Sequence, residues 1–478
     1  MANNFERYSS AIPAVLDGGR IALGREDEAP AARRPVRIFH EQPGDRVAQG
    51  ASAWVRALKR GVERLGQSMT GARWARRRAR WSARYILART WLSTHLPLPP
   101  RRGVRFLGYV EGSLGLGHTL RTQIRAYAQY SRRFSIYPFR LGIERRMIGP
   151  YLPEHYDLFR RYEVTVLDLA TDQLPHLYGH ISQMLLKDSY VVLRTFWELP
   201  AAPQAWAPLL EPIDEIWVPN NFVGDAFRPI FSGTIHVVPP CVDVTDGPFL
   251  ERADLGLSPE AFYVLFSFDY HSSTARKNPL AVVRAFTEAF PQTNRDVRLI
   301  IKTIGDHTLH QATHDALQQA AEADPRIHII HQDIPRQQMV SLIRACDCYV
   351  SLHRSEGFGS GMAEALLFGR RVVGTNFSGN TDFLTEETGY PVEYDLVPVA
   401  AGDYSWSEGQ VWAEPRHDSA VAALRAAYFD GPAADARAAA GAALIRSTYG
   451  VDAVGAAIAA RIETLRAERR ALKESRRG

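Results

Sequence analysis

The sequence of 478 residues predicts an α/β protein with two Rossmann-like, doubly wound domains facing a cleft. Three observations predict this fold: short apolar strands alternate with helices, the alternation stops at a linker and restarts, and each half has a glycine-containing loop after a strand. Such alternation indicates parallel sheets covered on both faces. Ligands of these sheets bind outside the carboxyl ends of the strands.

The composition is that of a globular protein, with 46% hydrophobic and 23% charged residues. No stretch reaches the roughly 18–20 uninterrupted apolar residues of a membrane helix, and the first residues lack the apolar core of a signal peptide. Three cysteines (Cys241, Cys346 and Cys348) are too few for a disulfide framework. We therefore expect a cytoplasmic protein.

A basic, partly disordered and partly helical N-terminal extension is predicted over residues 1–103. Residues 51–102 carry a charge of +12, so that the rest of a chain with net charge +5 carries −7. Trp74, Trp81 and Tyr85 fall near one face of the expected basic helix. Such a helix suits an anionic membrane surface, packing on the main body, or nucleic acid. We expect the membrane, at the inner face of the plasma membrane, and no nucleic acid.

The first domain is predicted over residues 104–245. Its expected strands are Val104–Val110, Phe134–Pro138, Val164–Leu169, Tyr190–Phe196, Glu215–Val218 and Ile235–Val238. The glycine loop at 112–117 follows the first strand and opens a helix that extends to about Arg133. No acidic residue ends the second strand, which disfavours a dinucleotide cofactor. His118, at the start of the helix, is either a ligand contact across the cleft or an ordinary polar residue of the first turn.

The second domain is predicted over residues 246–435, and a helical tail over 436–478 ends in an exposed, charged stretch from Leu465. The expected strands are Phe262–Asp269, Val297–Ile304, Ile327–Asp333, Cys348–Leu352 and Val372–Thr375. The expected helices are Arg276–Phe290, His310–Ala323, Pro335–Ala345 and Gly361–Phe368.

The stretch from Ser351 to Gly369 reads as a strand, a loop with three glycines, and an Ala- and Leu-rich helix. Backbone N–H groups at the start of such a helix bind a phosphate or a sugar oxygen. Glu356 and Glu364 flank the loop, and each carboxylate can accept hydrogen bonds from two neighbouring hydroxyl groups. The alternative is a connection whose glycines only let the chain turn.

Arg276 and Lys277 are adjacent cations where a helix is expected to begin. Cations are unfavourable at a helix N-terminus, which is already positive. A bound diphosphate would remove the conflict; the alternative is a solvated Arg-Lys pair. No Asp-x-Asp occurs in the sequence, so we expect no metal and no cofactor.

The segment Glu356-Gly357-Phe358-Gly359-Ser360-Gly361-Met362-Ala363-Glu364-Ala365 resembles the E-x7-E signature of retaining glycosyltransferases of family 4 (glycosyl transferases group 1), which have the GT-B fold. The similarity extends to Gly369, Val373 and Gly379-Asn380-Thr381, and includes Gly115-x-Gly117 and the Arg-Lys-Asn-Pro at 276–279. It covers about 104–435 and leaves residues 1–103 unexplained.

The resemblance implies a nucleotide-diphosphate sugar bound mainly by the second domain and an acceptor bound by the first. Glu356 would contact the donor sugar in catalysis, Glu364 the ribose, and Arg276 with Lys277 the diphosphate. The other donor contacts implied are Gly115, Gly117, Phe358, Gly359 and Ser360. The family's reaction is front-face displacement with retention, in which the leaving diphosphate helps to deprotonate the acceptor.

The first domain departs from the family pattern after the strand that ends near Phe196. Many relatives have a histidine there, whereas this sequence has Trp197 followed by Glu198. We expect Glu198 and His118 to take part in catalysis. Trp197 either stacks on an acceptor sugar, which we expect, or fills the core.

The sequence thus predicts a metal-independent, retaining glycosyltransferase that acts on a glycan or a lipid-linked acceptor in surface polysaccharide biosynthesis. The alternatives are a nucleotide-sugar 2-epimerase on the same fold and a non-catalytic protein that binds sugar or nucleic acid.

Overall fold

The computed structural model describes residues 100–143, 147–181, 185–244, 247–291 and 296–475. The predictions for residues 1–99, including the basic helix and its membrane contact, lie outside these residues. Within them, no helix combines the length and the apolar character that a membrane span requires.

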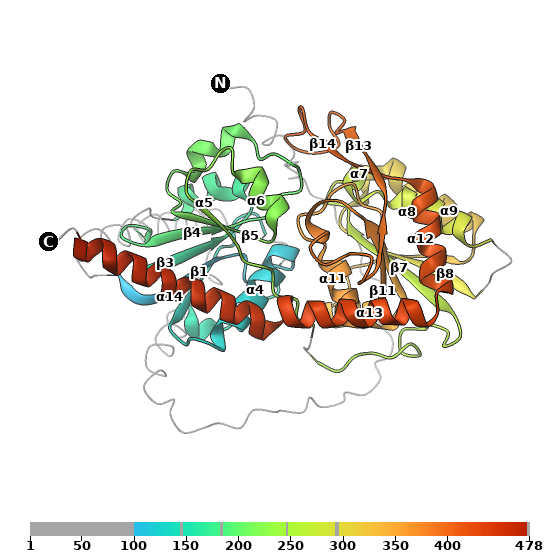
Figure 1. Ribbon diagram of the computed structural model, residues 1–478, viewed down its shortest axis with the longest axis horizontal. Helices are drawn as coiled ribbons and strands as arrows, with labels where there is room; N and C mark the ends of the chain where they lie inside the picture. The colour runs from blue at the N-terminus through green and yellow to red at the C-terminus, as the bar shows by residue number, and fades with distance from the viewer. Residues whose placement is uncertain (1–99, 144–146, 182–184, 245–246, 292–295, 476–478) are drawn as a thin grey trace, which may run out of the picture. The chain divides into compact units, whose positions relative to one another are not determined.

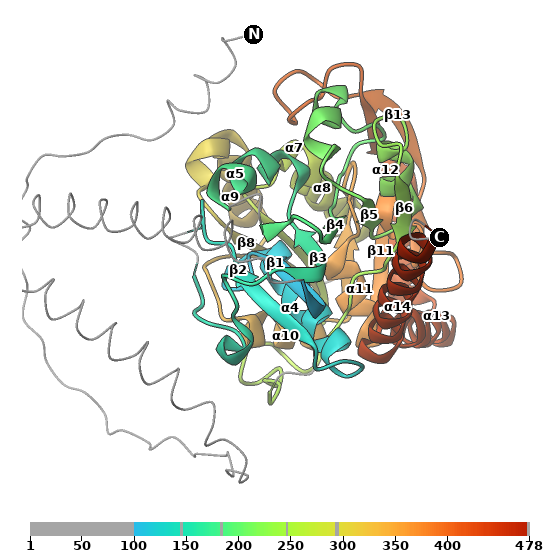
Figure 2. The same ribbon diagram turned by 90° about the vertical axis from the view of Figure 1, so that its left-hand side faces the viewer.

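The first sheet has six parallel strands in the order β2-β1-β3-β4-β5-β6, which Figure 2 shows from one edge to the other. The strands are β1 (Arg101–Gly108), β2 (Phe134–Pro138), β3 (Tyr162–Asp168), β4 (Tyr190–Arg194), β5 (Glu215–Val218) and β6 (Thr234–Val237). β2 and β5 span the predicted residues, and the other four overlap their predictions. The parallel sheet predicted for this half is confirmed.

The second sheet also has six parallel strands, in the order β12-β11-β10-β7-β8-β9. They are β7 (Phe262–Asp269), β8 (Val297–Ile304), β9 (Ile327–His331), β10 (Cys348–Ser351), β11 (Arg371–Thr375) and β12 (Tyr390–Val392). β7 and β8 span the predicted residues. The edge strand β12 was not predicted, because three residues are too few to show a pattern.

Helices cover both faces of each sheet (Figure 1). In the first half they are α4 (Gly115–Ala128), α5 (Leu174–His180) and α6 (Asn221–Phe227); in the second half, α7 (Thr274–Lys277), α8 (Pro279–Ala289), α9 (Gln311–Ala323), α10 (Arg336–Ala345), α11 (Ser360–Leu367), α12 (His417–Phe429) and α13 (Pro432–Leu444). Alternate residues of a strand enter different cores: Val264 and Phe266 pack with α8 and α12, whereas Tyr263 and Leu265 pack with α10 and α11. This is the alternation that a strand between two helical layers requires.

The predicted helix Arg276–Phe290 is two helices, α7 and α8. Asn278 separates them in a left-handed conformation, with φ of 53°. Pro279 follows, and a residue before proline is disfavoured in the α region. The prediction of one continuous helix is therefore wrong at its first turn.

The C-terminal tail joins both cores. A short π-helical turn, η7 (Ile445–Tyr449), packs in the second half. The long helix α14 (Val451–Ser475) returns to the first half and lies beside α4 (Figure 1). Its apolar stripe enters the core there, ending with the fully buried Leu465. The predicted exposed stretch is thus wrong at its start, because an apolar residue at helical spacing continues the buried stripe.

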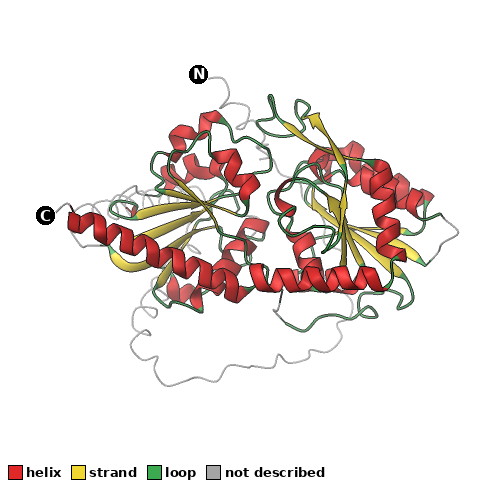
Figure 3. Cartoon of the chain, viewed as in Figure 1, coloured by secondary structure: helices red, strands yellow, loops and turns green. Residues whose placement is uncertain are grey.

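An antiparallel hairpin of β13 (Tyr394–Pro398) and β14 (Val411–Pro415) lies outside the two sheets (Figure 3). The sequence did not predict it. The segment that connects its strands, residues 399–410, contacts the first half of the chain at several points that bear on the site described below.

Candidate active site

The loop between β10 and α11 follows the carboxyl end of a central strand. Gly359 precedes the first residue of α11 with φ of 90°, and a Cβ there would lie 2.6 Å from the Met362 Cε. Glycine therefore has both a conformational and a steric reason at this position. Ser360, the first residue of α11, is exposed. This arrangement leaves the N–H groups of the first helical turn near an accessible surface.

Glu356 is held by its backbone as well as by its side chain. Its N–H donates to the Ser378 hydroxyl at 2.8 Å, and its carbonyl accepts from the Gly379 N–H at 2.9 Å. The residue is only 8% exposed. The segment at 378–379, 22 residues further along the chain, therefore fixes the backbone of Glu356.

Lys277 and Arg276 pair with the Glu356 carboxylate, the lysine through Oε1 and the Arg276 Nη1 at 3.2 Å from Oε2. Burial alone would raise the pKa of the Glu356 carboxyl, but the two cations outweigh burial and lower the pKa to about 2. Burial lowers the pKa of Lys277, although Glu356 opposes the shift. Burial also acts against the charge of Arg276, where the carboxylate dominates and raises the pKa.

The cation pair stands in the last turn of α7, not in the first turn of a long helix. Because the C-terminal end of a helix favours cations, the conflict inferred from the sequence is wrong. The Nε of the buried Arg276 has no hydrogen-bond partner among the described residues, so this donor is available to an acceptor oxygen. The Arg276 Nη1 donates to the Ser355 carbonyl at 2.8 Å, which fixes the guanidinium.

The second glutamate of the motif, Glu364, pairs with Arg336 at the start of α10. The Arg336 Nη1 donates to the Glu364 Oε2 at 3.0 Å, and the second oxygen pairs with Nη2. Arg336 also lies 3.3 Å from the His118 Nε2 of the first half. A guanidinium only donates hydrogen bonds, so this contact requires a neutral His118 that accepts through Nε2.

His118 belongs to the first helical region after β1, as predicted. Burial, Arg336, Arg121 and Arg125 together lower the pKa of His118 to about 3. Gly117 precedes it, and a Cβ on Gly117 would lie 2.5 Å from the Gly112 carbonyl oxygen. Gly115 is exposed at the start of α4, with open space around its Cα. Of these two glycines, Gly117 is the one at which a larger side chain would clash with the backbone.

Glu198 lies on the loop after β4 and meets the hairpin segment. The Tyr404 hydroxyl donates to the Glu198 Oε2 at 2.6 Å, and the Glu198 carbonyl accepts from the Ser355 hydroxyl. Burial, then Glu198, raises the pKa of Tyr404, while the Arg276 guanidinium lies 5.8 Å from its ring centroid. Glu198 thus comes next to the cation pair, although it belongs to the other half of the chain.

Two aromatic residues expected at ligands lie in the core. Trp197 is 6% exposed, with its ring edge-on to Trp206 and Tyr404, so the expected open stacking face is wrong. Phe358 is 4% exposed and packs against Phe383 and Tyr449, so its ring belongs to the core. Trp197 and Phe358 stand beside polar residues in the sequence, but their large apolar side chains are buried in the core, as is usual for such side chains.

Sequence reasoning missed Arg336, Tyr404, Asn220 and Ser378. Arg336 and Tyr404 are ordinary residues of a helix start and a surface loop, and no local pattern marks them. Asn220 shows a weak signal as a capping residue before a helix. Its Oδ1 caps α6, and its Nδ2 donates to the Gly357 carbonyl at 2.7 Å, which ties the glycine loop to the first half.

Comparison with known proteins gives the class. Residues 269–401 match the family described as Glycosyl transferases group 1. Sucrose-phosphate synthase from Thermosynechococcus elongatus superposes with a TM-score of 0.58 at 14% identity, over 77% of this chain and 100% of that chain. Anabaena HepE, solved with UDP and glucose, gives 0.56 at 14% identity, over 76% and 100%. No curated protein matches the sequence.

Two parallel six-stranded sheets with this likeness define a GT-B fold. The family match covers the glycine loop and both glutamates of the motif, and it identifies residues 269–401 as a glycosyl transferases group 1 domain. The chain therefore combines a GT-B fold with a glycosyltransferase domain of family 4 over residues 269–401. The predicted fold, family and enzyme class are confirmed.

Proposed function

We propose that the protein is a retaining, metal-independent glycosyltransferase that transfers a sugar from a UDP-sugar to a glycan or a lipid-linked acceptor in surface polysaccharide biosynthesis. The observation that carries this proposal is the buried carboxylate of Glu356 between Arg276 and Lys277. Charged groups are buried when they are paired, and here the cations adjoin the loop of the family motif. UDP is proposed because Anabaena HepE was solved with UDP-glucose.

The donor would bind where the cation pair, the first turn of α11 and Glu364 converge. Its diphosphate would interact with Arg276 and Lys277 and satisfy the buried Arg276 Nε, which has no hydrogen-bond partner in the part of the chain described. Glu356 would then turn from the cations toward the hydroxyls of the donor sugar. The two ribose hydroxyls would replace Arg336 and donate hydrogen bonds to the Glu364 carboxylate.

In the proposed reaction, the acceptor hydroxyl oxygen bonds to the anomeric carbon while the bond from that carbon to the diphosphate oxygen breaks on the same face. The acceptor proton passes to the leaving phosphate oxygen. Arg276 and Lys277 stabilise the charge that develops on the diphosphate, which is the main contribution expected of the protein. His118 and Glu198, from the first half, would position the acceptor and the donor sugar.

Donor binding can be tested by the change in melting temperature with UDP-, GDP- and dTDP-sugars. A ligand at about 100 times its dissociation constant stabilises the folded state by roughly 2.7 kcal/mol. We expect the largest shift with a UDP-sugar and its loss in Lys277→Gln. Equal shifts with all three nucleotides, or a shift kept in Lys277→Gln, would contradict the assignment of the donor or of the site.

The reaction type can be tested with an acceptor mixture and by product NMR. We expect transfer only when an acceptor is present, and an anomeric configuration equal to that of the donor. Formation of a 2-epimer from the donor alone would instead identify an epimerase.

The membrane part of the proposal concerns the basic segment outside the described residues. Glutamine at Arg73, Arg76, Arg77, Arg80 and Arg84 should release the full chain from vesicles of anionic lipid in a flotation assay, because the electrostatic attraction is lost. Flotation equal to that of the wild type would contradict membrane binding by this segment and would not affect the assignment of the donor.

A further inference from the structure

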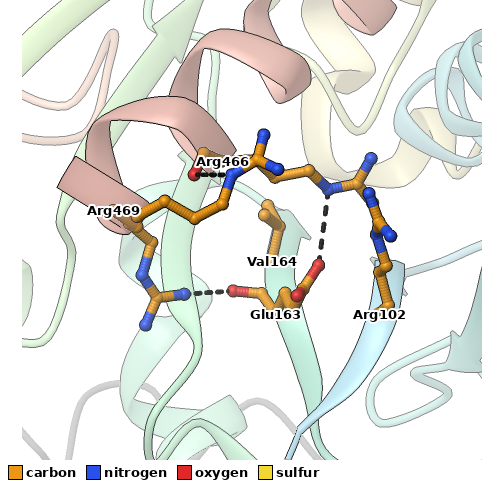
Figure 4. A pocket seen from close by; sticks show the side chains of 6 residues that line it. Arg102, Glu163, Val164, Arg466 and Arg469 are labelled. Carbon is orange, nitrogen blue, oxygen red and sulfur yellow. Dashed lines mark hydrogen bonds and ion pairs between the residues drawn. The ribbon is translucent and has the colours of Figure 1, made fainter. Parts of the chain in front are cut away.

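A cavity of about 250 Å³ lies at the opposite end of the first sheet from the residues described above. Its lining consists of Arg102, Glu163, Val164, Arg466, Arg469 and Arg470. Figure 4 shows Arg102 reaching it from β1, and Arg466 and Arg469 from α14. Arg102 and Glu163 stand at the amino ends of β1 and β3, whereas the loop at 112–117 follows the carboxyl end of β1. Eight residues of strand separate these ends by about 26 Å.

The lining has an excess of positive charge, because four arginines surround a single carboxylate. Arg469 donates to the backbone carbonyls of Glu163 and Asp188, at 2.6 and 2.9 Å, so its charge is not neutralised by these contacts. Arg470 donates to the Arg466 carbonyl at 3.3 Å. Arg102 is exposed at the rim and has no ion pair among the described residues.

The side chain of Arg466 is 11% exposed. Its Nη1 pairs with Glu463 outside the cavity. Its Nε is ion-paired with the Glu163 Oε2 at 3.4 Å, whereas its Nη2 is buried without a hydrogen-bond partner in the described part of the chain. A buried donor without an acceptor costs about 1–3 kcal/mol, and an anion in the cavity would remove this cost.

We propose that this cavity binds a phosphate group. A phosphate carries up to two negative charges and several acceptor oxygens, which suits forked guanidinium donors. A single water needs roughly 10–15 Å³ of such space, so the cavity has room for a phosphate and part of the molecule that carries it. Bound phosphate would tie the end of α14 to the amino ends of β1 and β3. The source is either a free phosphorylated solute or the headgroup of a membrane lipid.

The test compares the full chain with Arg102→Gln/Arg470→Gln, which removes two exposed side chains with no carboxylate partner among the described residues. Arg284→Gln, an exposed arginine on α8, is the matched control. Binding of inorganic phosphate is measured by titration calorimetry and by melting temperature, against chloride at equal ionic strength. Lys277→Gln is measured in parallel, because phosphate can also bind at the donor site.

We expect phosphate binding that is kept in Arg284→Gln and Lys277→Gln and weakened about tenfold or more in the double variant. Loss in Lys277→Gln with no change in the double variant would overturn the proposal, since the phosphate would then occupy only the donor site. An equal response of wild type and double variant, or no binding at all, would also overturn it.

Flotation then separates the two sources. Vesicles of phosphatidylcholine, with and without phosphatidic acid, are mixed with the same variants. Weaker flotation of the double variant than of Arg284→Gln, only with phosphatidic acid, would assign the cavity to a lipid headgroup. Equal flotation of the two variants, together with the calorimetric loss, would assign it to a free phosphorylated solute. Both outcomes are independent of whether the protein uses a UDP-sugar.

Discussion

The loop after β10 in the second half and the loops after β1 and β4 in the first half occupy equivalent places at the ends of parallel strands, but they are held in different ways. The second-half loop buries Glu356 between two cations of its own domain. In the first half, His118 and Glu198 find their polar partners, Arg336 and Tyr404, in the other half. The ion pairs of the proposed donor side therefore lie within one half, whereas the side-chain contacts of the proposed acceptor residues join the two halves.

The largest effect should come from Glu356→Gln, which tests the ion pairs within the second half. The variant leaves Arg276 and Lys277 buried without a carboxylate, and removing one partner of a buried pair costs about 3–5 kcal/mol. Transfer should fall by about 10²–10³-fold, measured by product formation at saturating donor. Normal turnover in a folded variant would refute the role of Glu356.

The same variant should change the stability at acid pH. The pKa of Glu356 is about 2 in the folded protein and about 4.5 as a free side chain. Its stabilisation is therefore fully present above pH 4.5 and is lost as the pH falls from 4.5 toward 2. Melting temperatures across this range should fall more steeply in the wild type than in Glu356→Gln. Parallel curves would show that the ion pairs do not contribute.

Arg336→Gln tests the link between the halves. The variant frees Glu364 from its charged partner and removes the contact with His118. We expect the KM for the donor to change by about tenfold, with a smaller change in kcat, because the affected groups bind and do not react. Arg344→Gln, later on the same helix, is the control. A loss confined to kcat would contradict a binding role.

Tyr404→Phe removes only the hydroxyl that donates to Glu198 and keeps the ring against Trp197. A hydrogen bond to a charged group contributes about 1.5–3 kcal/mol, so kcat/KM should fall by about tenfold if Glu198 is positioned by this bond. Trp406→Phe, on the same segment, should have little effect. Equal losses in both variants would indicate a general loosening of the hairpin segment.

The last prediction concerns His118, whose pKa is about 3 in the folded protein and about 6.5 when free. The unfolded chain takes up the proton first, so the free energy of unfolding falls as the pH drops below 6.5, by up to about 1.4 kcal/mol per pH unit. His118→Asn should flatten this slope between pH 6.5 and 4.5 in denaturant titrations. An unchanged slope would show that His118 is not held neutral.

Much of the fold could be predicted from local pattern. The strands β2, β5, β7 and β8 were placed at their observed residues, because each is a short segment rich in β-branched or aromatic residues. The failures were elements whose form depends on neighbours: the break at Asn278, the three-residue β12 and the β13–β14 hairpin.

The glycine loop and its two glutamates were visible in the sequence, since the residues that shape it lie within one short segment. The partners of those residues were not. Arg336 reaches Glu364 and His118, and Tyr404 reaches Glu198, from segments that carry no motif.

The sequence by itself determined the two parallel sheets, because strands and helices alternate along it. The resemblance of one short segment to a family signature indicated the glycosyltransferase class and the position of the proposed donor motif. Only the tertiary structure decided that Glu356 pairs with both cations, that Trp197 fills a core, and that α14 carries arginines to the amino ends of β1 and β3. These are contacts between segments up to several hundred residues apart. Burial and ion pairing at such separations depend on how the chain packs, which local spacing does not encode.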